Sequence, residues 1–254
     1  MKSKRRKRVL AIIPARYGSK RLPGKPLADI AGKPMIVHVM ERVAQATLVD
    51  EVIVATDDER IALTVQSHGG TAILTPSGIA SGSDRIAYVA RPLRGAEIVV
   101  NVQGDEPLIP PAMIDEAVRP VLKDPEILVC TLVRRIRSVE EYQNPNLPKV
   151  VLDQDGNCLY FSRSPIPYGR EMRAADLIAN TPLYCHIGLY VFRKRFLRSF
   201  ASLAATPLER AEKLEQLRIL EHGYPIHAVV TEHESFAVDT PEDLERVRAM
   251  VALK

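Results

Sequence analysis

Short apolar runs alternate with segments of helical periodicity along the first half of the chain. The apolar runs cover residues 9–13, 51–56, 71–74 and 97–102, and the helical segments cover residues 34–46, 59–68, 84–90 and 111–122. Apolar runs of this kind are typical of strands that are covered on both faces, as in a parallel sheet. The pattern predicts the α/β class, with a mostly parallel, Rossmann-like three-layer sheet that carries helices on both faces.

The pattern changes near residue 125, where strands follow one another without intervening helices. Strands are predicted at residues 127–134, 149–152, 158–161 and 183–192, with a turn at residues 155–157. We expect residues 127–192 to contribute an antiparallel extension that caps a site or pairs with another subunit. Residues 162–182 show little periodicity and predict a loop over the site. Further helices are predicted from Arg195, Pro207, Lys213 and Pro241, with a strand at residues 226–231.

The composition is that of a soluble globular protein, with 46% hydrophobic and 26% charged residues over 254 positions. This length fits one large α/β domain. Because we find neither an apolar run of membrane-spanning length nor a signal peptide, we expect a cytoplasmic protein without membrane association. The widely spaced Cys130, Cys158 and Cys185 fit reduced thiols better than a disulfide framework or a zinc site.

Positive charge is concentrated in residues 2–8, KSKRRKR, which carry six cations. Subtracting these six from the formal net charge of +4 leaves −2 for the rest of the chain. We therefore expect residues 1–8 to be a disordered basic tail and residues 9–254 to form the working domain. Nucleic-acid binding is not expected, because it needs a basic face on the folded domain. A weak electrostatic partner for the tail remains an open alternative.

A basic loop follows the first predicted strand. Residues 16–25, RYGSKRLPGK, place four cations before the first acidic residue, Asp29; these cations are Arg16, Lys20, Arg21 and Lys25. Open α/β sheets bind ligands at the carboxyl ends of their strands, where glycine lets backbone N–H groups approach phosphate oxygens and cations neutralise them. The loop predicts a polyphosphate site, and a solvated basic loop is the alternative. Its glycine spacing fits neither a P-loop nor a dinucleotide fingerprint.

Two aspartates also follow apolar segments, Asp105 after a predicted strand and Asp239 after a short apolar run. Asp105 lies in the turn at residues 103–107, and Asp239 precedes the last helix. If the sheet is parallel, both face the crevice beyond the strand ends, where one or two carboxylates and substrate phosphates could hold Mg²⁺. The alternatives are a turn-bracing role for Asp105 and a helix cap for Asp239, although Thr240 is the better cap. We interpret Asp58, after the second strand, as a helix cap.

Several ordered motifs resemble those of cytidylyltransferases that activate acidic sugars, and within these the 3-deoxy-manno-octulosonate (Kdo) cytidylyltransferase family. The motifs are IIPARYGSKRLPGKPL at residues 12–27, GKPMI at 32–36, NVQGDEP at 101–107, YFSR at 160–163, HIGLY at 186–190, LEQLR at 214–218 and VDTPEDL at 238–244. The resemblance runs from about residue 9 to the end. Residues 169–173 and 233–236 depart from the expected pattern, which leaves the substrate contacts there open.

This resemblance implies an activity: CTP and Kdo give CMP-Kdo and diphosphate, for lipopolysaccharide biosynthesis in a Gram-negative bacterium. It also implies the nucleotide-diphospho-sugar transferase fold, dependence on Mg²⁺ and a homodimer. A transferase for another acidic sugar, such as 8-amino-Kdo or a sialic acid, is the closest alternative. A non-catalytic nucleotide-binding protein is another, but it would not need both Asp105 and Asp239.

The resemblance also implies roles for individual residues. Arg16, Arg21 and Lys25 would hold the CTP phosphates, with Arg16 and Lys25 nearest the reacting one. Ser83 and Gln103 would lie near the cytidine, and Asp105 and Asp239 would hold Mg²⁺. The sugar pocket would be lined by Arg163, His186, Tyr190, Glu215 and Gln216.

The sugar-pocket residues also have ordinary structural interpretations. The planar guanidinium of Arg163 can pair with a carboxylate, but it could equally form a surface salt bridge. His186 and Tyr190, four residues apart on one predicted strand, could both be sheet residues packed against the core. Glu215 and Gln216 could lie on a helix surface. The sugar-binding role of His186, Tyr190, Glu215 and Gln216 therefore rests mainly on the family resemblance.

Overall fold

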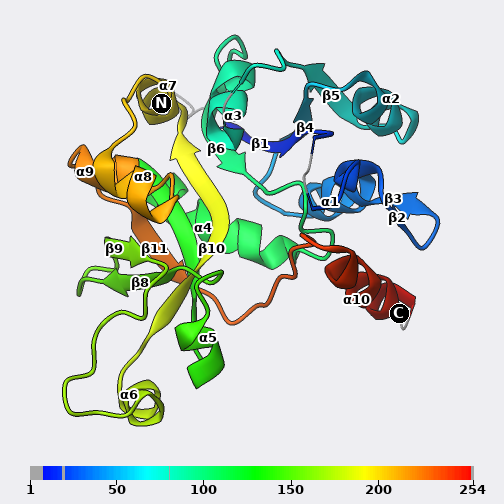
Figure 1. Ribbon diagram of the computed structural model, residues 1–254. Helices are drawn as coiled ribbons and strands as arrows, with labels where there is room; N and C mark the ends of the chain where they lie inside the picture. The colour runs from blue at the N-terminus through cyan, green and yellow to red at the C-terminus, as the bar shows by residue number, and fades with distance from the viewer. Residues whose placement is uncertain (1–7, 19–20, 80, 253–254) are drawn as a thin grey trace.

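The computed structural model describes residues 8–18, 21–79 and 81–252. Its main sheet has nine strands, in the order β11-β7-β10-β6-β1-β4-β5, with β8 and β9 attached through β10 (Figure 1). These strands are β1 (Arg8–Ala15), β4 (Glu51–Thr56), β5 (Thr71–Leu74), β6 (Ala96–Asn101), β7 (Val129–Arg135), β8 (Lys149–Leu152), β9 (Cys158–Ser162), β10 (Tyr184–Arg193) and β11 (His227–Val230). The expected tail lies outside the described residues, except for Arg8, and so does Lys20 of the basic loop.

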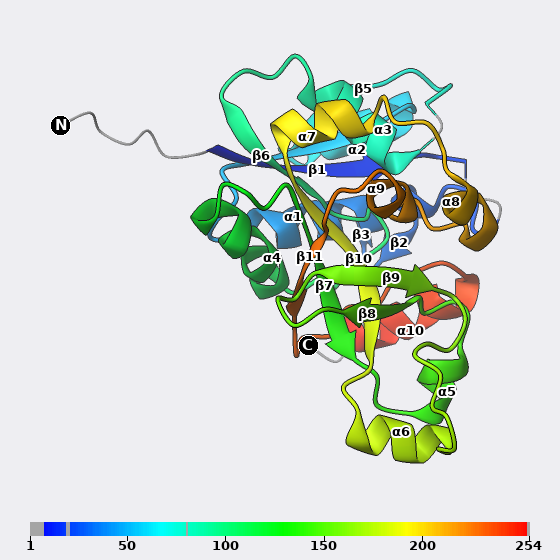
Figure 2. The same cartoon turned by 90° about the vertical axis from the view of Figure 1, so that its left-hand side faces the viewer.

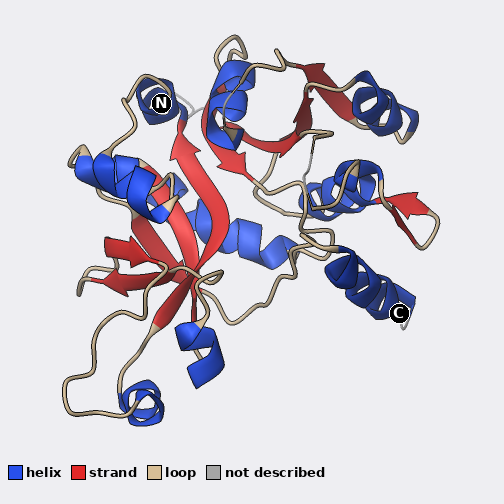
Figure 3. Ribbon diagram, viewed as in Figure 1, coloured by secondary structure: helices blue, strands red, loops and turns tan. Residues whose placement is uncertain are grey.

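One half of the sheet is parallel, as predicted. Strand β1 pairs in parallel with both β4 and β6, so that Ile12 lies between Ile53 and Asn101. Alternate residues of β1 enter two different cores: Ile13 packs with α1, α2 and α4 on one face, and Ile12 packs with α3 and α7 on the other. This double burial explains the continuous apolar run, and Figure 3 shows helices on both sides of the strands.

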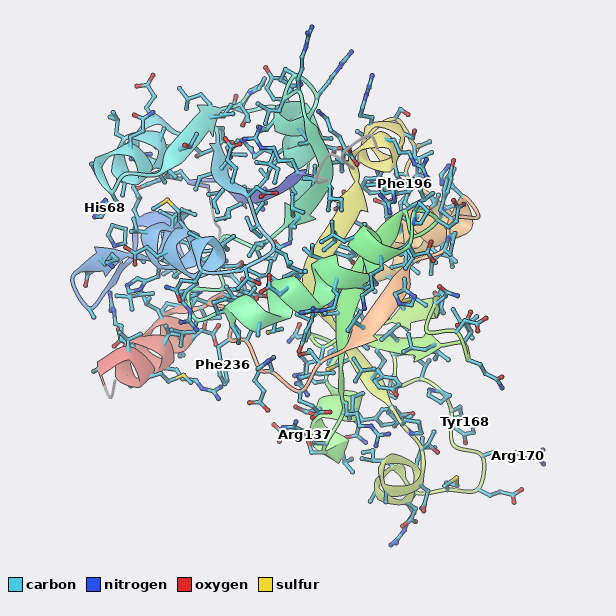
Figure 4. The ribbon with its side chains drawn as sticks, turned by 180° about the vertical axis from the view of Figure 1, so that it is seen from behind. His68, Arg137, Tyr168, Arg170, Phe196 and Phe236 are labelled. Atoms are coloured by element: carbon cyan, nitrogen blue, oxygen red, sulfur yellow. The ribbon has the colours of Figure 1, made fainter. Side chains whose placement is uncertain are left out.

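The other half is mainly antiparallel and is organised around β10. Strand β10 pairs with β7 along nearly its whole length, while on its other edge its carboxyl-terminal part pairs with β6 and its amino-terminal end pairs with β8. Helices α5 (Val139–Gln143) and α6 (Ala174–Asn180) pack together beyond the ends of these strands (Figure 2). Tyr168 and Arg170 lie at the outer end of this extension (Figure 4). The antiparallel extension expected near residues 127–192 is therefore present as a set of strands with two helices.

The other helices are α1 (Met35–Ala44), α2 (Glu59–Ser67), α3 (Gly82–Ala90), α4 (Pro111–Lys123), α7 (Lys194–Phe200), α8 (Pro207–Glu212), α9 (Leu217–Glu221) and α10 (Pro241–Ala252), with a short 3₁₀ helix at Lys25–Leu27. The prediction of a loop throughout residues 162–182 was wrong, because α6 buries Leu177 against Ile136 and Tyr142. The helix expected from Lys213 begins at Leu217 instead, because Lys213 takes a left-handed conformation with φ of 55°. The hairpin of β2 (Asp29–Ile30) and β3 (Lys33–Pro34) and helix α5 were not predicted.

A strap at residues 231–240 connects β11 to α10. It crosses from the extension to the parallel half, where Ser235 donates a hydrogen bond to Glu106 at 2.8 Å. At its start, Arg137 forms an ion pair with Glu234 at 2.8 Å, and Figure 4 shows Arg137 and Phe236 along this path. In the part of the chain that the structure describes, no helix has the length and apolar character that a membrane span requires.

Candidate active site

A cavity of about 570 Å³ opens beyond the carboxyl ends of β1 and β6. Because these strands are parallel neighbours, the loops that follow them meet at the same edge of the sheet. Its lining comes from the basic loop, the start of α3, the turn after β6 and the residue before α10: Pro14, Ala15, Arg16, Gly18, Arg21, Lys25, Pro26, Ile79, Ser81, Gly82, Arg85, Gln103, Gly104, Asp105 and Asp239. The structure thus brings together Arg16, Arg21, Lys25, Asp105 and Asp239, as the sequence predicted.

Lys25 joins the two aspartates at this cavity. Its Nζ lies 2.7 Å from Asp105 Oδ2 and 3.0 Å from Asp239 Oδ1, and Arg21 reaches the other oxygen of Asp239 at 3.0 Å. Burial acts to lower the pKa of Lys25, but charge attraction and hydrogen bonds from Asp105 and Asp239 outweigh it, so the pKa is raised. The ammonium group therefore stays protonated and can bind an anion.

The two aspartates are held by contacts between their loops. The backbone N–H of Val238 donates to the carbonyl of Asp105 at 2.8 Å, which ties the strap to the turn after β6. Thr240 and Asp243 form the cap of α10, because each side chain accepts a backbone N–H from the other residue. Asp239 is thus free of a capping role. Burial raises the pKa of the neighbouring Glu106 to about 7, and the Asp105 charge adds to this shift.

Two glycines make the approach of these loops possible. A side chain at Gly104 would place its Cβ 2.7 Å from the carbonyl oxygen of Pro14, so only glycine lets the turn before Asp105 pass the end of β1. Gly24 has a φ of 69°, and its N–H donates to Tyr17 O at 3.2 Å. This bond closes the basic loop so that Lys25 follows directly at the cavity.

Arg85 is a site residue that the sequence interpretation missed. It is 4% exposed, lines the cavity, forms an ion pair with Asp57 at 2.8 Å and also contacts Thr75. Arg85 lies two residues after Ser83, and a sequence signal that could have pointed to it is the acidic pair Asp57 and Asp58 after β4. Asp58, next to Asp57, caps α2 by accepting from Arg60 N at 2.9 Å, as expected.

A second, smaller pocket of about 130 Å³ adjoins the cavity, and Gly82 and Gln103 line both. It is lined by Gly82, Ser83, Asn101, Gln103, Tyr190, Phe192, Phe200, Glu215, Gln216 and Ile219. Three of its polar atoms are buried and have no hydrogen-bond partner among the residues described: Asn101 Oδ1, Tyr190 OH and Gln216 Nε2. Because unpaired buried polar groups cost free energy, these atoms indicate a polar ligand.

Glu215 lies where the pocket and the cavity meet. One carboxylate oxygen accepts from Ser81 and the other from Ser83, each at 2.8 Å. Burial raises the pKa of Glu215, and these two hydrogen bonds oppose that shift. Gln103 donates to Gly188 O at 3.0 Å, so the turn after β6 also contacts β10. Ser83 lines the smaller pocket, whereas Ser81 lines the larger cavity.

His186 and Tyr190 lie together on β10, although a bulge separates them. Their rings are 5.2 Å apart, and His186 Nε2 lies 2.9 Å from Thr131 Oγ1. Because the Thr131 hydroxyl donates to Leu189 O at 2.8 Å, its oxygen is left to accept from the histidine. Burial lowers the pKa of His186 to about 3. His186 is thus a neutral group behind Tyr190, and it does not itself line either space.

Arg163 does not line the cavity or the smaller pocket. Its guanidinium donates to three backbone carbonyls: Glu212 O at 2.8 Å, Pro145 O at 2.9 Å and Lys213 O at 3.4 Å. The structure therefore does not bring this side chain together with the other residues expected around a sugar.

Asp105 and Asp239 fit a hard divalent cation that a substrate would help to bind. Both carboxylates face one cation, Lys25, and offer the oxygen ligands that Mg²⁺ prefers. Among the residues described, no group of three or more His, Cys, Asp or Glu could hold a metal. Phosphate oxygens would have to complete the shell around two carboxylates.

A cationic loop and two carboxylates that meet beyond the carboxyl ends of parallel strands β1 and β6 define a nucleotidyltransferase-like α/β protein. Residues 10–233 match the family model described as cytidylyltransferase, so the chain belongs to this family. It is 55% identical over 245 residues to the 3-deoxy-manno-octulosonate cytidylyltransferase of Geobacter sulfurreducens, covering 94% of this chain and 97% of the relative. It is 52% identical to the protein of that name from Solibacter usitatus, covering 95% and 93%.

A solved structure supports the same conclusion. A CMP:2-keto-3-deoxy-manno-octonic acid synthetase complexed with CTP superimposes with a TM-score of 0.90 and 43% identity. The alignment covers 97% of this chain and 99% of that one. The family and the α/β fold expected from the sequence motifs are therefore confirmed.

Proposed function

We propose that this protein transfers the cytidylyl group of CTP to Kdo, giving CMP-Kdo and diphosphate for lipopolysaccharide biosynthesis. The main support is the convergence of Lys25, Asp105 and Asp239 at one cavity. The cavity adjoins a pocket with unpaired polar atoms, so a charged triphosphate and a polyhydroxylated acceptor have adjacent sites of suitable chemistry.

The phosphate side of the reaction falls to the basic loop. Arg16, Arg21 and Lys25 bind the triphosphate, and Arg16 and Lys25 stabilise the charge that builds on the reacting phosphate. Asp105 and Asp239 would hold Mg²⁺, which supplies charge neutralisation and a lower pKa for the attacking hydroxyl when bound. Because phosphoryl chemistry needs little covalent help, positioning by these residues provides most of the catalysis.

The sugar side falls to the smaller pocket. Tyr190 OH and Gln216 Nε2 are available to bind sugar hydroxyls, and Glu215 can accept from another hydroxyl. Gln103 lines both spaces and lies between the cytidine and sugar sites, with Ser83 beside it. His186 supports Tyr190 from behind. Arg163 can bind the sugar carboxylate only if its guanidinium leaves the carbonyls that it now contacts.

Two further properties belong to the same proposal. The extension offers strand edges and exposed apolar side chains, including Leu159 and Tyr168, that suit a homodimer contact. We also propose a cytoplasmic location, because CTP and reduced thiols are found there and Cys130, Cys158 and Cys185 are all free.

A diphosphate-release assay tests the activity. The protein is incubated with CTP, Mg²⁺ and one acid sugar at a time: Kdo, 8-amino-Kdo or a sialic acid. We expect release with Kdo at the highest kcat/KM and none when Mg²⁺ is removed. A higher kcat/KM with another sugar would reassign the substrate, and CTP binding without release from any sugar would favour a non-catalytic nucleotide-binding protein.

A further inference from the structure

The carboxylate of Glu212 connects two segments that lie far apart in the chain. Glu212 is the last residue of α8, and it accepts from Ser162 Oγ at 2.5 Å and from the backbone N–H of Arg163 at 2.9 Å. Ser162 and Arg163 lie at the end of β9. One side chain thus holds the end of that strand against the end of α8.

The side chain of Arg163 in turn contacts the backbone at Glu212. Its Nε donates to the carbonyl of Glu212 at 2.8 Å, and its guanidinium also reaches Lys213 O at 3.4 Å. The two residues therefore form a closed ring of side-chain and backbone hydrogen bonds. This ring immobilises the backbone of residues 212 and 213.

The turn that this ring holds contains a residue with an unfavourable backbone conformation. Lys213 has a φ of 55°, a left-handed conformation in which a residue with a Cβ is disfavoured. The turn ends α8 and redirects the chain into Leu214, Glu215 and Gln216. A conformation of this kind persists only where its surroundings enforce it, and Glu212 with Arg163 supplies that restraint.

A second cation lies beside the ring. Lys149 is opposite Ser162 in the β8–β9 pairing, is completely buried, and donates to Asn144 O at 2.7 Å. Burial lowers the pKa of Lys149 and the nearby charge of Arg163 adds to this shift, while Cys185 and, to a smaller extent, the Glu212 carboxylate oppose it. Glu212 thus acts on Lys149 and Arg163 together, while its own side chain lines neither the cavity nor the smaller pocket.

We propose that Glu212 is a positioning residue for the acceptor side of the reaction. It fixes the turn at Lys213 and so aims the Glu215 carboxylate and the Gln216 amide into the smaller pocket, without touching either substrate. The inference rests on the proposed function, because it assigns the pocket to the sugar. It predicts that losing Glu212 weakens the use of the sugar and leaves the use of CTP unchanged.

Steady-state kinetics test this split. In Glu212→Ala we expect the KM for Kdo to rise by about tenfold, with the KM for CTP within about twofold of the wild type. Glu212→Gln should recover most of the loss, because its amide oxygen can still accept from Arg163 N. Glu140→Ala is the matched control, since Glu140 is exposed on α5 and should change neither constant.

A second variant separates positioning from general stability. Glycine adopts left-handed φ without a Cβ penalty, so Lys213→Gly added to Glu212→Ala should bring the KM for Kdo back by about threefold. A merely destabilised protein would lose thermal stability and CTP binding without this recovery. An unchanged KM for Kdo in Glu212→Ala, or equal increases for both substrates, would overturn the proposal.

Hydrogen exchange provides a test that needs no turnover. In Glu212→Ala without substrates, the amides of residues 213–219 should exchange faster than in the wild type, while those of β1 keep their protection. Unchanged exchange there would contradict the positioning role. A wild-type protein that releases no diphosphate from CTP and Kdo would instead contradict the proposed function, so the two failures can be told apart.

Discussion

At the scale of single residues, the site depends on charges that compensate one another. Lys25 is 15% exposed and holds Asp105 and Asp239 together, so two carboxylates and one cation form a compact group. A triphosphate substrate brings negative charge to Lys25, and its metal ion brings positive charge to Asp105 and Asp239. The same contacts therefore hold the three side chains together and suit a magnesium–triphosphate ligand.

Asp105→Asn tests the role of this group. We expect kcat to fall by roughly a hundredfold or more, because the amide is a poor Mg²⁺ ligand and a weaker partner for Lys25. The fold should persist, since the side chain lies at a cavity. Diphosphate release at several Mg²⁺ concentrations measures the effect, with Asp155→Asn in an exposed turn as the control. Near-normal turnover at low Mg²⁺ would show that Asp105 is not a metal ligand.

His186 makes stability depend on pH. Its folded pKa of about 3 lies below the unfolded value of about 6.5, so its contribution is complete above about pH 6.5 and is lost as the pH falls toward 3. Because the residue is only partly buried, we expect a loss of about 1–2 kcal/mol between about pH 7 and pH 5.

Urea unfolding at these two pH values measures this loss. The free energy of unfolding of His186→Asn should be lower at neutral pH but should change less on acidification. His222→Gln, at an exposed position, should keep the wild-type pH dependence. Equal slopes for wild type and His186→Asn would rule out the contribution of His186.

At the scale of elements, the site is made where strand ends pass each other at close range. The turn after β6 reaches the end of β1 only because Gly104 has no side chain. This close approach sets where Asp105 points, and the bond from Val238 N to Asp105 O then fixes Asp239 relative to it. Local backbone geometry and catalytic geometry are thus coupled.

Gly104→Ala should separate activity from folding. Its Cβ would meet the Pro14 carbonyl at 2.7 Å, so the turn must shift. We expect a loss of about 1–3 kcal/mol in unfolding free energy and a proportionally larger loss of kcat/KM, because Asp105 moves. Thermal melting and diphosphate release measure the two effects. Gly78→Ala is the control, because a Cβ there meets nothing within 4 Å and should change neither the unfolding free energy nor kcat/KM. If Gly104→Ala also left both quantities unchanged, the close approach of this turn to β1 would be unimportant.

Elements with a strong apolar pattern were predictable from the sequence, and those formed by distant partners were not. Strands β4, β5 and β8 have the expected bounds, and β4 and β8 bury part of their apolar runs as the pattern indicated, whereas β5 at the edge of the sheet stays half-exposed. Helix α6 was not predicted, because Leu177 is its single buried residue and one buried position does not establish a helical apolar pattern.

The candidate site shows the same division. The basic loop and Asp105 were predictable because they follow strands β1 and β6, whose ends meet at the same edge of a parallel sheet. Asp239 reaches the same cavity by a different route, because the strap at residues 231–240 carries it there from β11. The contacts of Arg163 were not predictable, since its partners Pro145 and Glu212 lie 18 and 49 residues away in the sequence. The buried pair of Arg85 and Asp57 depends in the same way on tertiary packing.

At the scale of the whole molecule, charge is distributed unevenly between the ends of the chain. The six cations of residues 2–8 account for the positive net charge, and the remaining chain is slightly acidic. Among the residues described, the cavity draws its cations from residues 16–25 and from Arg85.

Arg8 is the first residue of β1 and forms an ion pair with Glu51, so the deletion that removes only the remaining basic segment is that of residues 2–7, and it should leave the enzyme intact. We expect kcat/KM for CTP and Kdo within about twofold of the wild type at physiological salt, because distant exposed charges are screened. Gel-shift measurements with DNA should show no binding by the shortened protein. A large loss of activity would reveal that the tail acts on the site, and persistent DNA binding would reveal a basic face on the folded domain.

The ten-residue strand β10 has a consequence for how the protein can be divided. Its carboxyl-terminal end hydrogen-bonds to β6, the strand that precedes Asp105, and its amino-terminal end pairs with β8 of the β8–β9 hairpin. Gly188 and Tyr190 lie along the strand between its two ends. If the chain is divided within β10, neither the CTP-binding fragment nor the sugar-binding fragment keeps all the residues of its binding site. Chimaeras between relatives should therefore exchange the outer end of the extension and keep β10 with its parallel neighbours, so that both substrates still meet across a single uninterrupted backbone.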